Sequence, residues 1–309
     1  MGVSVIILTW NGRALLAESL PSVIAAARAY GREECEIRVV DNGSSDGSGE
    51  YLAREFPEVK LLAFPENLGF ARALNRGVAV SAHRRVILLN NDVTVDEDFI
   101  APLAAHFSRE DVFCAGARML FPGGKRVYFG RASGTFRYGF FLRRLSDPSV
   151  SCPSLYGCGG GMMVDRDKFL ALGGFDEDME IYWEDLDVCY RAWKRGWATV
   201  YEPRSRMIHR VSATNSAAWG AGGIAARSGR NYFAFVIKNI HDRLFVSVQI
   251  CTLPLFLLLL LFSGKIAFCG GVISAIAGAR VFLRTRAVLR AEAVRTDRQI
   301  LAVTSTKQR

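Results

Sequence analysis

The residues VSVIILTWNG at 3–12 determine how the first third of the chain is built. Residues 3–8 are apolar and β-branched, which is typical of a buried strand, and Thr9, Trp10, Asn11 and Gly12 form a turn cluster. Residues 13–30 follow with apolar side chains at helical spacing. A buried strand that ends in a polar turn and leads directly into a helix predicts the first unit of an alternating α/β domain.

The same alternation continues along the chain. Further strands are expected at 37–40, 60–64 and 86–89, with a helix ending near Phe56 and another at 70–80. This order predicts a mostly parallel sheet with helices on both faces. Polar clusters follow three of the strands, at 9–11, 41–46 and 90–92. Ligands of such sheets bind at the carboxyl ends of the strands, so we expect the three clusters to converge.

The clusters exclude two kinds of nucleotide site. Neither G-x-G-x-x-G nor G-x-x-x-x-G-K-[ST] follows the first strand, so a dinucleotide cradle and a P-loop are both missing. Carboxylates such as Asp41 and Asp92 can instead accept hydrogen bonds from a nucleoside or ligate a divalent cation that bridges phosphates. From the residues alone, Asp41 is more typical of an Asx-turn than of a ligand site, and Asp46 is interpreted as a turn or helix-start residue.

Composition and charge narrow the class further. Hydrophobic residues make up 50% of the 309 residues and charged residues 22%, which excludes a disordered chain and a coiled-coil rod. Seven scattered cysteines without a C-x-x-C pair predict reduced thiols, and no signal peptide is visible. The net charge is +9, but residues 280–309 alone contribute +6. A basic segment beside an apolar run favours an anionic membrane surface over nucleic acid.

The apolar run is residues 244–264, which contain no charge. A helix of this length would reach roughly 30 Å, enough to cross a bilayer. After Lys265, residues 266–279 are again uncharged but shorter and rich in glycine. The pattern predicts membrane attachment and leaves open one span, two spans or an interfacial position. A buried helical hairpin of a soluble protein is the alternative.

Six pieces of the chain, taken in order, resemble the family 2 glycosyltransferases, and especially the rhamnosyltransferase-like branch that builds bacterial surface polysaccharides. They are VSVIILTWN at 3–11, VVDNGSSDGS at 39–48, NLGFARALNRG at 67–77, LLNNDV at 88–93, GGFDEDMEIYWEDLDVCYRAWKRGW at 173–197, and His209. The resemblance implies a GT-A fold over residues 1–240. The nucleotide-binding half would be 1–110 and the acceptor-binding half 111–240, followed by a membrane-associated helical segment at 241–283 and a basic tail at 284–309.

The resemblance also implies roles for individual residues. The donor-binding residues would be Thr9, Asn11, Asp41, Asn67, Asn75 and Asn91. A Mg²⁺ or Mn²⁺ ion would be held by Asp92 and His209. Asp185 would be the catalytic base with Glu184 beside it, and the acceptor would contact Trp183, Gly159 and Gly160. Asn90 departs from the family's D-x-D pattern, in which the first residue is acidic.

Chemical reasoning from the residue types agrees with these roles without requiring them. An attacking hydroxyl must lose its proton, so a positioned carboxylate such as Asp185 suits a general base. Glu184, Asp185 and Asp187 also lie near the start of a predicted helix, where the helix dipole favours negative charge in any protein. The glycine-rich run at 157–161 fits either close approach of an acceptor sugar or a crowded turn. Residues 136–144 fit a β-hairpin arm, or a contact with a glycan or lipid head group.

The implied function is an inverting transfer of a sugar from a nucleoside-diphosphate donor to a lipid-linked or cell-surface glycan. It would occur on the cytoplasmic face of the plasma membrane, without nucleic acid as a partner. Both dTDP-rhamnose and a UDP-linked hexose remain open as donor. A processive polysaccharide synthase is the alternative, although the chain lacks Q-x-x-R-W and further spans, and an enzyme that makes the donor would need a phosphate loop that is missing. A catalytically inactive sugar-binding scaffold also stays open because of Asn90.

Overall fold

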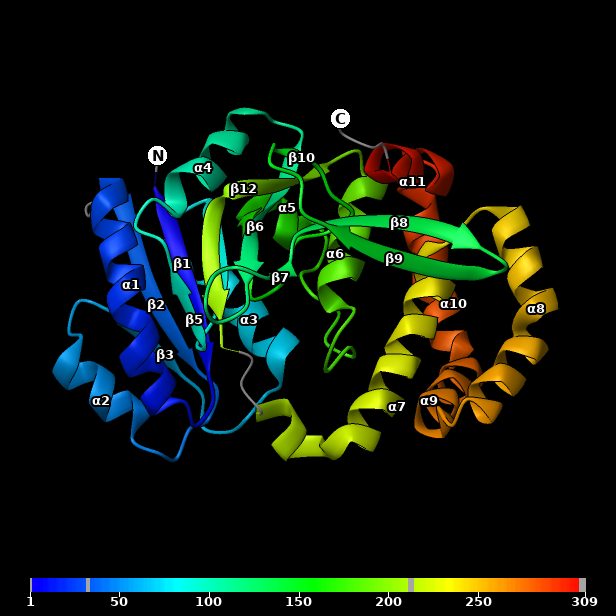
Figure 1. The fold of residues 1–309 in the computed structure, drawn as a ribbon, viewed down its shortest axis with the longest axis horizontal. Helices are drawn as coiled ribbons and strands as arrows, with labels where there is room; N and C mark the ends of the chain where they lie inside the picture. The colour runs from blue at the N-terminus through cyan, green and yellow to red at the C-terminus, as the bar shows by residue number, and fades with distance from the viewer. Residues whose placement is uncertain (1, 32–33, 211–213, 306–309) are drawn as a thin grey trace.

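The computed structural model describes residues 2–31, 34–210 and 214–305 of the chain. It is an α/β structure with one large sheet and a two-stranded arm (Figure 1). The strands are β1 Val3–Thr9, β2 Cys35–Asp41, β3 Lys60–Ala63, β4 Arg85–Asn90, β5 Val93–Val95, β6 Val112–Leu120, β7 Val127–Phe129, β8 Arg131–Arg137, β9 Phe140–Ser146, β10 Cys152–Pro153, β11 Gly161–Asp165 and β12 Ala198–His209.

The helices fall into two groups along the chain. Those of the α/β region are α1 Arg13–Gly31, α2 Ser48–Glu55, α3 Phe70–Ala79, α4 Ile100–Ala105, α5 Arg166–Ala171 and α6 Glu184–Lys194, with a short 3₁₀ turn at His106–Ser108. Those that follow are α7 Thr214–Asn239, α8 Arg243–Phe262, α9 Ile266–Ala277, α10 Ala279–Ala291 and α11 Asp297–Ser305.

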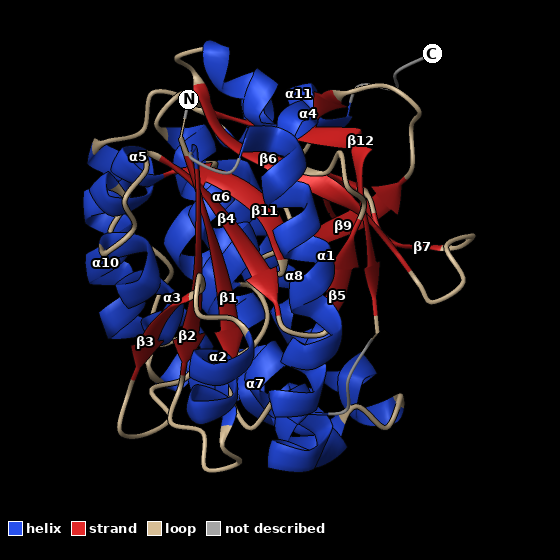
Figure 2. Ribbon diagram, turned by 90° about the vertical axis from the view of Figure 1, so that its left-hand side faces the viewer, coloured by secondary structure: helices blue, strands red, loops and turns tan. Residues whose placement is uncertain are grey.

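The large sheet has the order β10-β12-β6-β11-β4-β1-β2-β3. Its first half, β3-β2-β1-β4, is entirely parallel, and helices pack on both faces (Figure 2). β11 then runs antiparallel to both β4 and β6, while β12 is parallel to β6. The predicted α/β class with its parallel strands is confirmed, and antiparallel strands enter only in the second half.

Strand register brings the polar clusters together. Thr9 is paired with Asp41 across β1 and β2, and Leu8 is paired with Asn90 across β1 and β4. The three strands therefore end at one level, and the residues that follow them share one edge of the sheet. The buried β-branched residues of β1 and β4 hold that level by packing against helices on both sides.

The helices after residue 214 return to the α/β region. α9 packs along α7, and α7 in turn contacts α6. The segment from 284 onward includes α11, whose Ile300 and Thr304 are fully buried where α11 packs against β8. Most of the basic C-terminal segment described by the structure is therefore helical and partly built into the core.

Asp297 is the buried junction of this arrangement. Its Oδ1 accepts hydrogen bonds from Tyr190 and Lys194 of α6, at 2.7 and 2.6 Å. Its Oδ2 accepts the backbone N–H groups of His241 and Asp242, both at 2.7 Å, immediately before α8. One carboxylate thus ties the start of α8 to α6 and α11, and the two N–H groups and the ammonium offset the cost of burying it.

Candidate active site

The polar strand ends that the sequence predicts to converge are joined by hydrogen bonds. Asn91 Nδ2 donates to Thr9 Oγ1 at 2.9 Å, which links the ends of β4 and β1. The Asn11 N–H donates to Ser44 Oγ at 2.8 Å, and the Ser44 N–H donates to Asp41 Oδ1 at 2.9 Å, which links β1 to β2. Thr9 and Asp41 are buried beneath this network. Four of the predicted donor residues therefore form one rigid rim.

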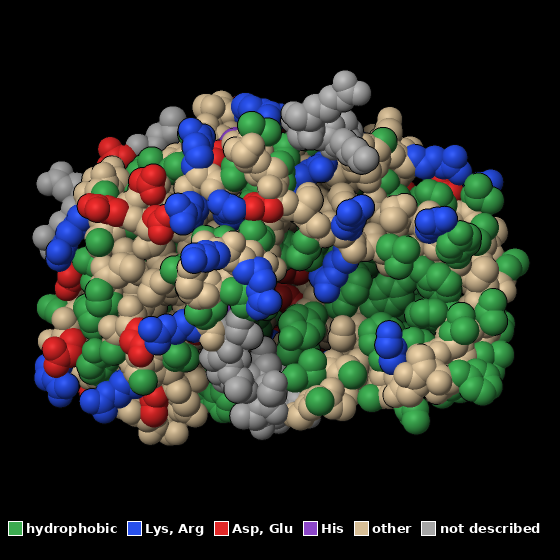
Figure 3. Space-filling model, viewed as in Figure 1, with side chains coloured by type: hydrophobic (Ala, Val, Ile, Leu, Met, Phe, Trp, Pro, Cys, Tyr) green, Lys and Arg blue, Asp and Glu red, His purple; other side chains and the backbone are tan. Residues whose placement is uncertain are grey.

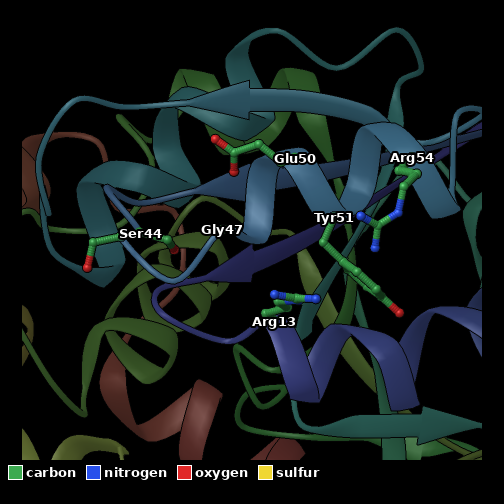
Figure 4. A pocket seen from close by; sticks show the side chains of 7 residues that line it. Arg13, Ser44, Gly47, Glu50, Tyr51 and Arg54 are labelled. Atoms are coloured by element: carbon green, nitrogen blue, oxygen red, sulfur yellow. The ribbon is translucent and has the colours of Figure 1, made fainter.

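A pocket of about 340 Å³ opens on the outer side of this rim. It lies between α1 and α2, and in Figure 4 the side chains of Arg13 and Tyr51 reach toward each other across it. The Arg13 guanidinium lies 5.2 Å from the centre of the Tyr51 ring, and Ser44 lines the opposite side. The pocket contains neither Asp92 nor Asp185, so it borders the predicted nucleoside residues and not the reaction centre.

The other two predicted donor residues make bonds within the protein. Asn42 Nδ2 donates to Asn67 Oδ1 at 2.8 Å, so Asn67 connects the loop after β3 to the loop after β2. Asn75 donates to the Phe175 carbonyl at 3.0 Å and accepts from the Phe175 N–H at 2.8 Å. Asn75 thus holds the Gly174-Phe175 turn that precedes the predicted catalytic segment.

The predicted metal residues are adjacent although they are 117 positions apart. Asp92 follows β4, His209 ends β12, and Asp92 Oδ1 lies 3.2 Å from His209 Nε2. Both side chains are buried, and the Asp92 carbonyl accepts the Arg210 N–H at 2.9 Å, which fixes the two segments together. Antiparallel pairing of β12 with β5 brings His209 to this place.

A carboxylate oxygen and an imidazole nitrogen at this separation fit a divalent cation such as Mn²⁺. The buried Nδ1 of His209 has no hydrogen-bond partner among the described residues, so a turn of the ring toward a cation would break no protein hydrogen bond at that nitrogen. Within the described residues, no group of three or more His, Cys, Asp or Glu side chains could hold a metal. The remaining ligands would have to come from elsewhere, and phosphate oxygens of a nucleotide would serve.

Gly159 and Gly160 lie between Asn90, at the end of β4, and the predicted base Asp185. The Gly159 N–H donates to Asp185 Oδ2 at 3.3 Å. A Cβ atom on Gly160 would lie 2.5 Å from Asn90 Nδ2, so the absence of a side chain lets Asn90 pack against this turn. Asn90 is two residues before Asp92. The close packing shows that the glycine run serves protein contacts here, whatever it does for an acceptor.

The backbone before α6 is strained at two successive residues. Tyr182 and Trp183 both have positive φ, at 58° and 77°, in a region that bulky side chains rarely occupy. Asn231 of α7 holds this conformation by donating to the carbonyls of Ile181 and Tyr182, at 2.8 and 3.2 Å. Strain of this kind at the start of a helix with adjacent carboxylates indicates a functional site.

This conformation separates the two aromatic side chains. Trp183 is buried against α7, with its ring 5.1 Å from that of Tyr232, whereas Tyr182 is 47% exposed. Trp183 was predicted to contact the acceptor, but Tyr182 is the one of these two aromatic side chains that is exposed.

Glu184 and Asp185 differ in burial, and this difference separates their protonation. Burial raises the pKa of Glu184 well above its usual range, and the charge of Asp185 raises it further. Burial also raises the pKa of Asp185, while the guanidinium of Arg143 and the N–H groups of Gly159 and Leu186 oppose that rise. Adjacent carboxyls do not ionise together easily, and the contacts with Arg143, Gly159 and Leu186 favour ionisation of Asp185 before Glu184. Asp185 is also the more exposed of the two.

Arg143 is a site residue that the sequence analysis did not identify. It lies on β9 of the two-stranded arm, in the 136–144 segment that was expected to be either a hairpin or a contact arm, and the hairpin is confirmed. Its guanidinium lies 4.9 Å from the centre of the Trp183 ring and donates to the Tyr156 hydroxyl at 2.8 Å. The alternation of aromatic and Arg residues in that segment was the available signal.

Tyr128 lies beside His209 at the candidate site. Burial raises the pKa of Tyr128, and the nearby Cys158, Tyr182 and Asp92 raise it further. Its ring centre is also 4.7 Å from that of His209. Figure 3 shows acidic side chains at the bottom of a central hollow with Lys and Arg around its rim.

Asp187, the third carboxylate of the segment, has a structural role. It accepts from Arg191 at 2.7 Å and from Asn239 at 2.8 Å, and Lys238 lies 3.0 Å away. Burial would raise the pKa of Asp187, but Lys238 and Arg191 outweigh it and bring the pKa to about 2. Arg191 also donates to the carbonyls of Leu172 and Gly174, which fixes the turn before the strained loop.

A doubly wound nucleotide-binding sheet, with a buried Asp–His pair and a strained loop carrying carboxylates at its edge, defines the chain as an α/β protein of the GT-A type. Residues 4–173, more than half of the chain, match the model of the family described as Glycosyl transferase family 2. The chain belongs to this family.

Among curated proteins, the chain is 29% identical over 205 residues to N-acetylglucosaminyl-diphospho-decaprenol L-rhamnosyltransferase of Mycobacterium tuberculosis, which covers 56% of the chain and 66% of the relative. It is 26% identical over 225 residues to the O-antigen biosynthesis protein RfbC of Myxococcus xanthus, covering 69% of the chain and 18% of the relative. The chain thus spans just under two thirds of the mycobacterial relative's length.

Two solved structures confirm the fold. One is GalNAc-T7 with UDP, GalNAc and Mn²⁺, at a TM-score of 0.61 and 20% identity, covering 79% of this chain and 48% of that one. The other is the mannosyltransferase PcManGT of Pyrobaculum calidifontis in complex with GDP-Man and Mn²⁺, at a TM-score of 0.56 and 16% identity, covering 94% of this chain and 85% of that one.

Proposed function

We propose that the chain is an inverting glycosyltransferase that moves a sugar from a nucleoside-diphosphate donor to a lipid-linked glycan. The observation that carries the proposal is the turn at Gly159 and Gly160, which contacts Asp185 on one side and Asn90, two residues from Asp92, on the other. The proposed site for the leaving diphosphate, at Asp92, and the proposed base, Asp185, therefore lie close to one short turn. The mycobacterial relative, named as a transferase acting on a diphospho-decaprenol sugar, supports the lipid-linked acceptor and makes rhamnose a candidate sugar.

In this proposal the rim formed by Thr9, Asn11 and Asp41 holds the nucleoside. Asp92 and His209 would hold Mn²⁺ or Mg²⁺, which when bound stabilises the negative charge of the departing diphosphate. Asp185 takes the proton of the acceptor hydroxyl as the hydroxyl attacks. The Gly159 and Leu186 N–H groups orient its carboxylate, at 3.3 and 2.7 Å, so that it need not be ordered during the reaction.

Glu184 and Arg143 tune this base without touching the substrate. Burial and the charge of Asp185 raise the pKa of Glu184, which disfavours a second negative charge beside Asp185. Arg143 offsets part of the cost of keeping Asp185 ionised. We assign both as positioning residues. The division proposed for the chain follows from the same geometry: residues 1–110 supply the donor rim, and 111–240 supply Gly159, Gly160 and Asp185.

The nucleotide and metal are tested by thermal shift on the full chain with dTDP-rhamnose, UDP-glucose, UDP-N-acetylglucosamine or GDP-mannose, each with and without Mn²⁺. We expect one nucleotide to raise the midpoint by a few degrees only when Mn²⁺ is present, because a ligand at 100 times its Kd stabilises by about 2.7 kcal/mol. If every nucleotide leaves the midpoint unchanged in both conditions, the proposed donor site is wrong.

Arg143→Gln is expected to move the acid limb of the kcat–pH profile to higher pH. Asp185 must be ionised to accept a proton, so kcat falls as the pH drops through its pKa. Arg143 lowers that pKa, and its removal therefore raises it. Arg144→Gln is the matched control, since Arg144 is exposed on the same strand. An acid limb that stays in place in both variants would leave Arg143 only a packing role on Trp183.

A further inference from the structure

Helix α8 has two faces that differ in what covers them. One face packs inward, with buried or half-buried side chains at helical spacing: Phe245, Gln249, Thr252, Phe256 and Leu260. The opposite face, which we call the outer face of α8, consists of exposed apolar residues: Leu244, Ile250, Leu255, Leu258, Leu259 and Phe262. Phe262 is 87% exposed and Ile250 66%. In water such a continuous apolar surface is costly, so another apolar phase must cover it.

By length and composition α8 is the one described helix that could cross a membrane alone, and α9 with α10 would do so only as a pair bent by 67°. The inward face of α8 argues against crossing. Phe245 stacks on Phe136 with ring centres 4.5 Å apart and planes at 10°, and Phe256 contacts Phe140 at 4.2 Å. A Cβ atom on Gly139, at the hairpin turn, would lie 2.2 Å from Thr252 Oγ1.

The hairpin fixed to α8 is charged. Arg137 and Arg143 flank the phenylalanines that contact the helix, and Arg144 follows. If α8 crossed the hydrocarbon core with these contacts intact, the arginines would be drawn in with it, at a cost of several kcal/mol for each charge near the centre of the bilayer. The hairpin therefore keeps α8 outside the hydrocarbon core, at the level of the α/β region.

Both ends of α8 are also fixed to the α/β region. Asp297 and the N-cap Asp242 hold its start. After its end, α9 crosses α7 at glycines: a Cβ on Gly271 would lie 1.9 Å from the Ala226 carbonyl oxygen, and one on Gly229 would lie 2.2 Å from the Phe268 carbonyl oxygen. Such close backbone packing fixes α9 on α7, so α8 could extend away from the protein only if this contact were broken.

The charged residues around α8 indicate what kind of surface covers its outer face. Residues 243–291 contain six Arg or Lys and no Asp or Glu. Arg243 and Lys265 are exposed at the two ends of α8, and Arg280 and Arg284 are exposed on α10. The N-cap Asp242 is paired with Arg298, so the exposed charges beside the apolar face are cations. This arrangement matches an anionic bilayer surface, where cations meet phosphate head groups and apolar side chains enter the acyl boundary. A second copy of the chain would bring like charges together.

We propose that the outer face of α8 lies in the plane of an anionic membrane surface, and that α8 does not cross the bilayer. In Figure 3 this face lies on the right, where hydrophobic side chains gather over α8. The inference rests on the proposed function for its lipid-linked acceptor and specifies how the enzyme meets it. In the β8–β9 hairpin, Phe140 contacts α8 and Arg143 contacts Trp183. The proposed membrane contact and the segment that carries the proposed base Asp185 are therefore connected by one short strand.

Cysteine labelling tests the orientation in the full chain. Lys265→Cys and, as the control on the α/β region, Glu97→Cys are made in a Cys251→Ser background and expressed in bacterial membranes. An impermeant maleimide is expected to label both in inside-out vesicles and neither in right-side-out vesicles. Labelling of Lys265→Cys from the face opposite to Glu97→Cys would mean that α8 crosses, and would overturn the proposal.

Vesicle flotation tests the membrane contact itself. The purified chain is expected to float with vesicles of phosphatidylcholine and phosphatidylglycerol, and to float less at high salt. Leu258→Glu should reduce the bound fraction about tenfold, because it places a charge on the outer face. Val80→Glu, an exposed apolar site elsewhere, should not. If the wild type does not float, or both variants float equally well, the proposal fails. Neither experiment measures sugar transfer, so its outcome is independent of the proposed activity.

Discussion

Asp185→Asn is expected to lower kcat by about 10²- to 10⁴-fold while the donor still binds, because the contribution of general-base catalysis is of that size. The amide is nearly the same size as the carboxylate, and its oxygen can still accept the 2.7 Å bond from the Leu186 N–H, whereas the longer 3.3 Å bond from Gly159 is lost. The variant should therefore fold and keep the strained loop. The amide cannot take up the proton of the attacking hydroxyl, so the variant loses general-base catalysis.

Two matched variants separate chemistry from structure. Asp178→Asn changes an exposed carboxylate a few residues earlier and should leave kcat unchanged. Glu184→Gln replaces a buried carboxyl whose pKa is raised by burial and by the charge of Asp185, so it should cost far less than Asp185→Asn. Kinetic assays of the three variants, with a thermal shift by the donor as a binding check, decide the assignment. Wild-type turnover by Asp185→Asn would remove Asp185 from the mechanism.

The parallel half of the fold could be predicted because its signals are local. The strands found at Val3–Thr9 and Arg85–Asn90 are only one or two residues longer than expected. They could be located because a β-branched run that ends in a polar turn is a local signal for a strand. The convergence of Thr9, Asp41 and Asn91 also follows from local signals, because parallel strands end at one edge of a sheet.

The contacts that shape the second half could not be predicted in this way. Arg143 reaches Trp183 from a hairpin forty residues away, and Asn75 bonds to Phe175 at a separation of one hundred. No periodicity encodes such pairs, because they depend on how strands of opposite direction are placed beside β4. The positive φ of Trp183 could not be predicted from the sequence either, because bulky residues avoid that conformation unless tertiary hydrogen bonds enforce it.

Asp92→Ala is expected to abolish the Mn²⁺-dependent thermal shift by the donor and to lower kcat by about 10²- to 10³-fold, the usual cost of removing one group that stabilises developing charge. Asp92 lies 3.2 Å from His209, and the described residues include no group of three or more His, Cys, Asp or Glu side chains that could hold a metal. Loss of the carboxylate leaves a single imidazole, which is too weak a site for Mn²⁺ at micromolar to millimolar concentrations.

The thermal shift gives a readout that does not depend on turnover. Asp98→Ala, which removes an exposed carboxylate six residues further on, should keep the full shift with donor and Mn²⁺. His209→Ala should behave like Asp92→Ala, since the two side chains act as one site. If Asp92→Ala retained the Mn²⁺-dependent shift while the donor remained bound, the cation would have to be held elsewhere. The Asp–His pair at the ends of β4 and β12 would then be a structural contact between two strands.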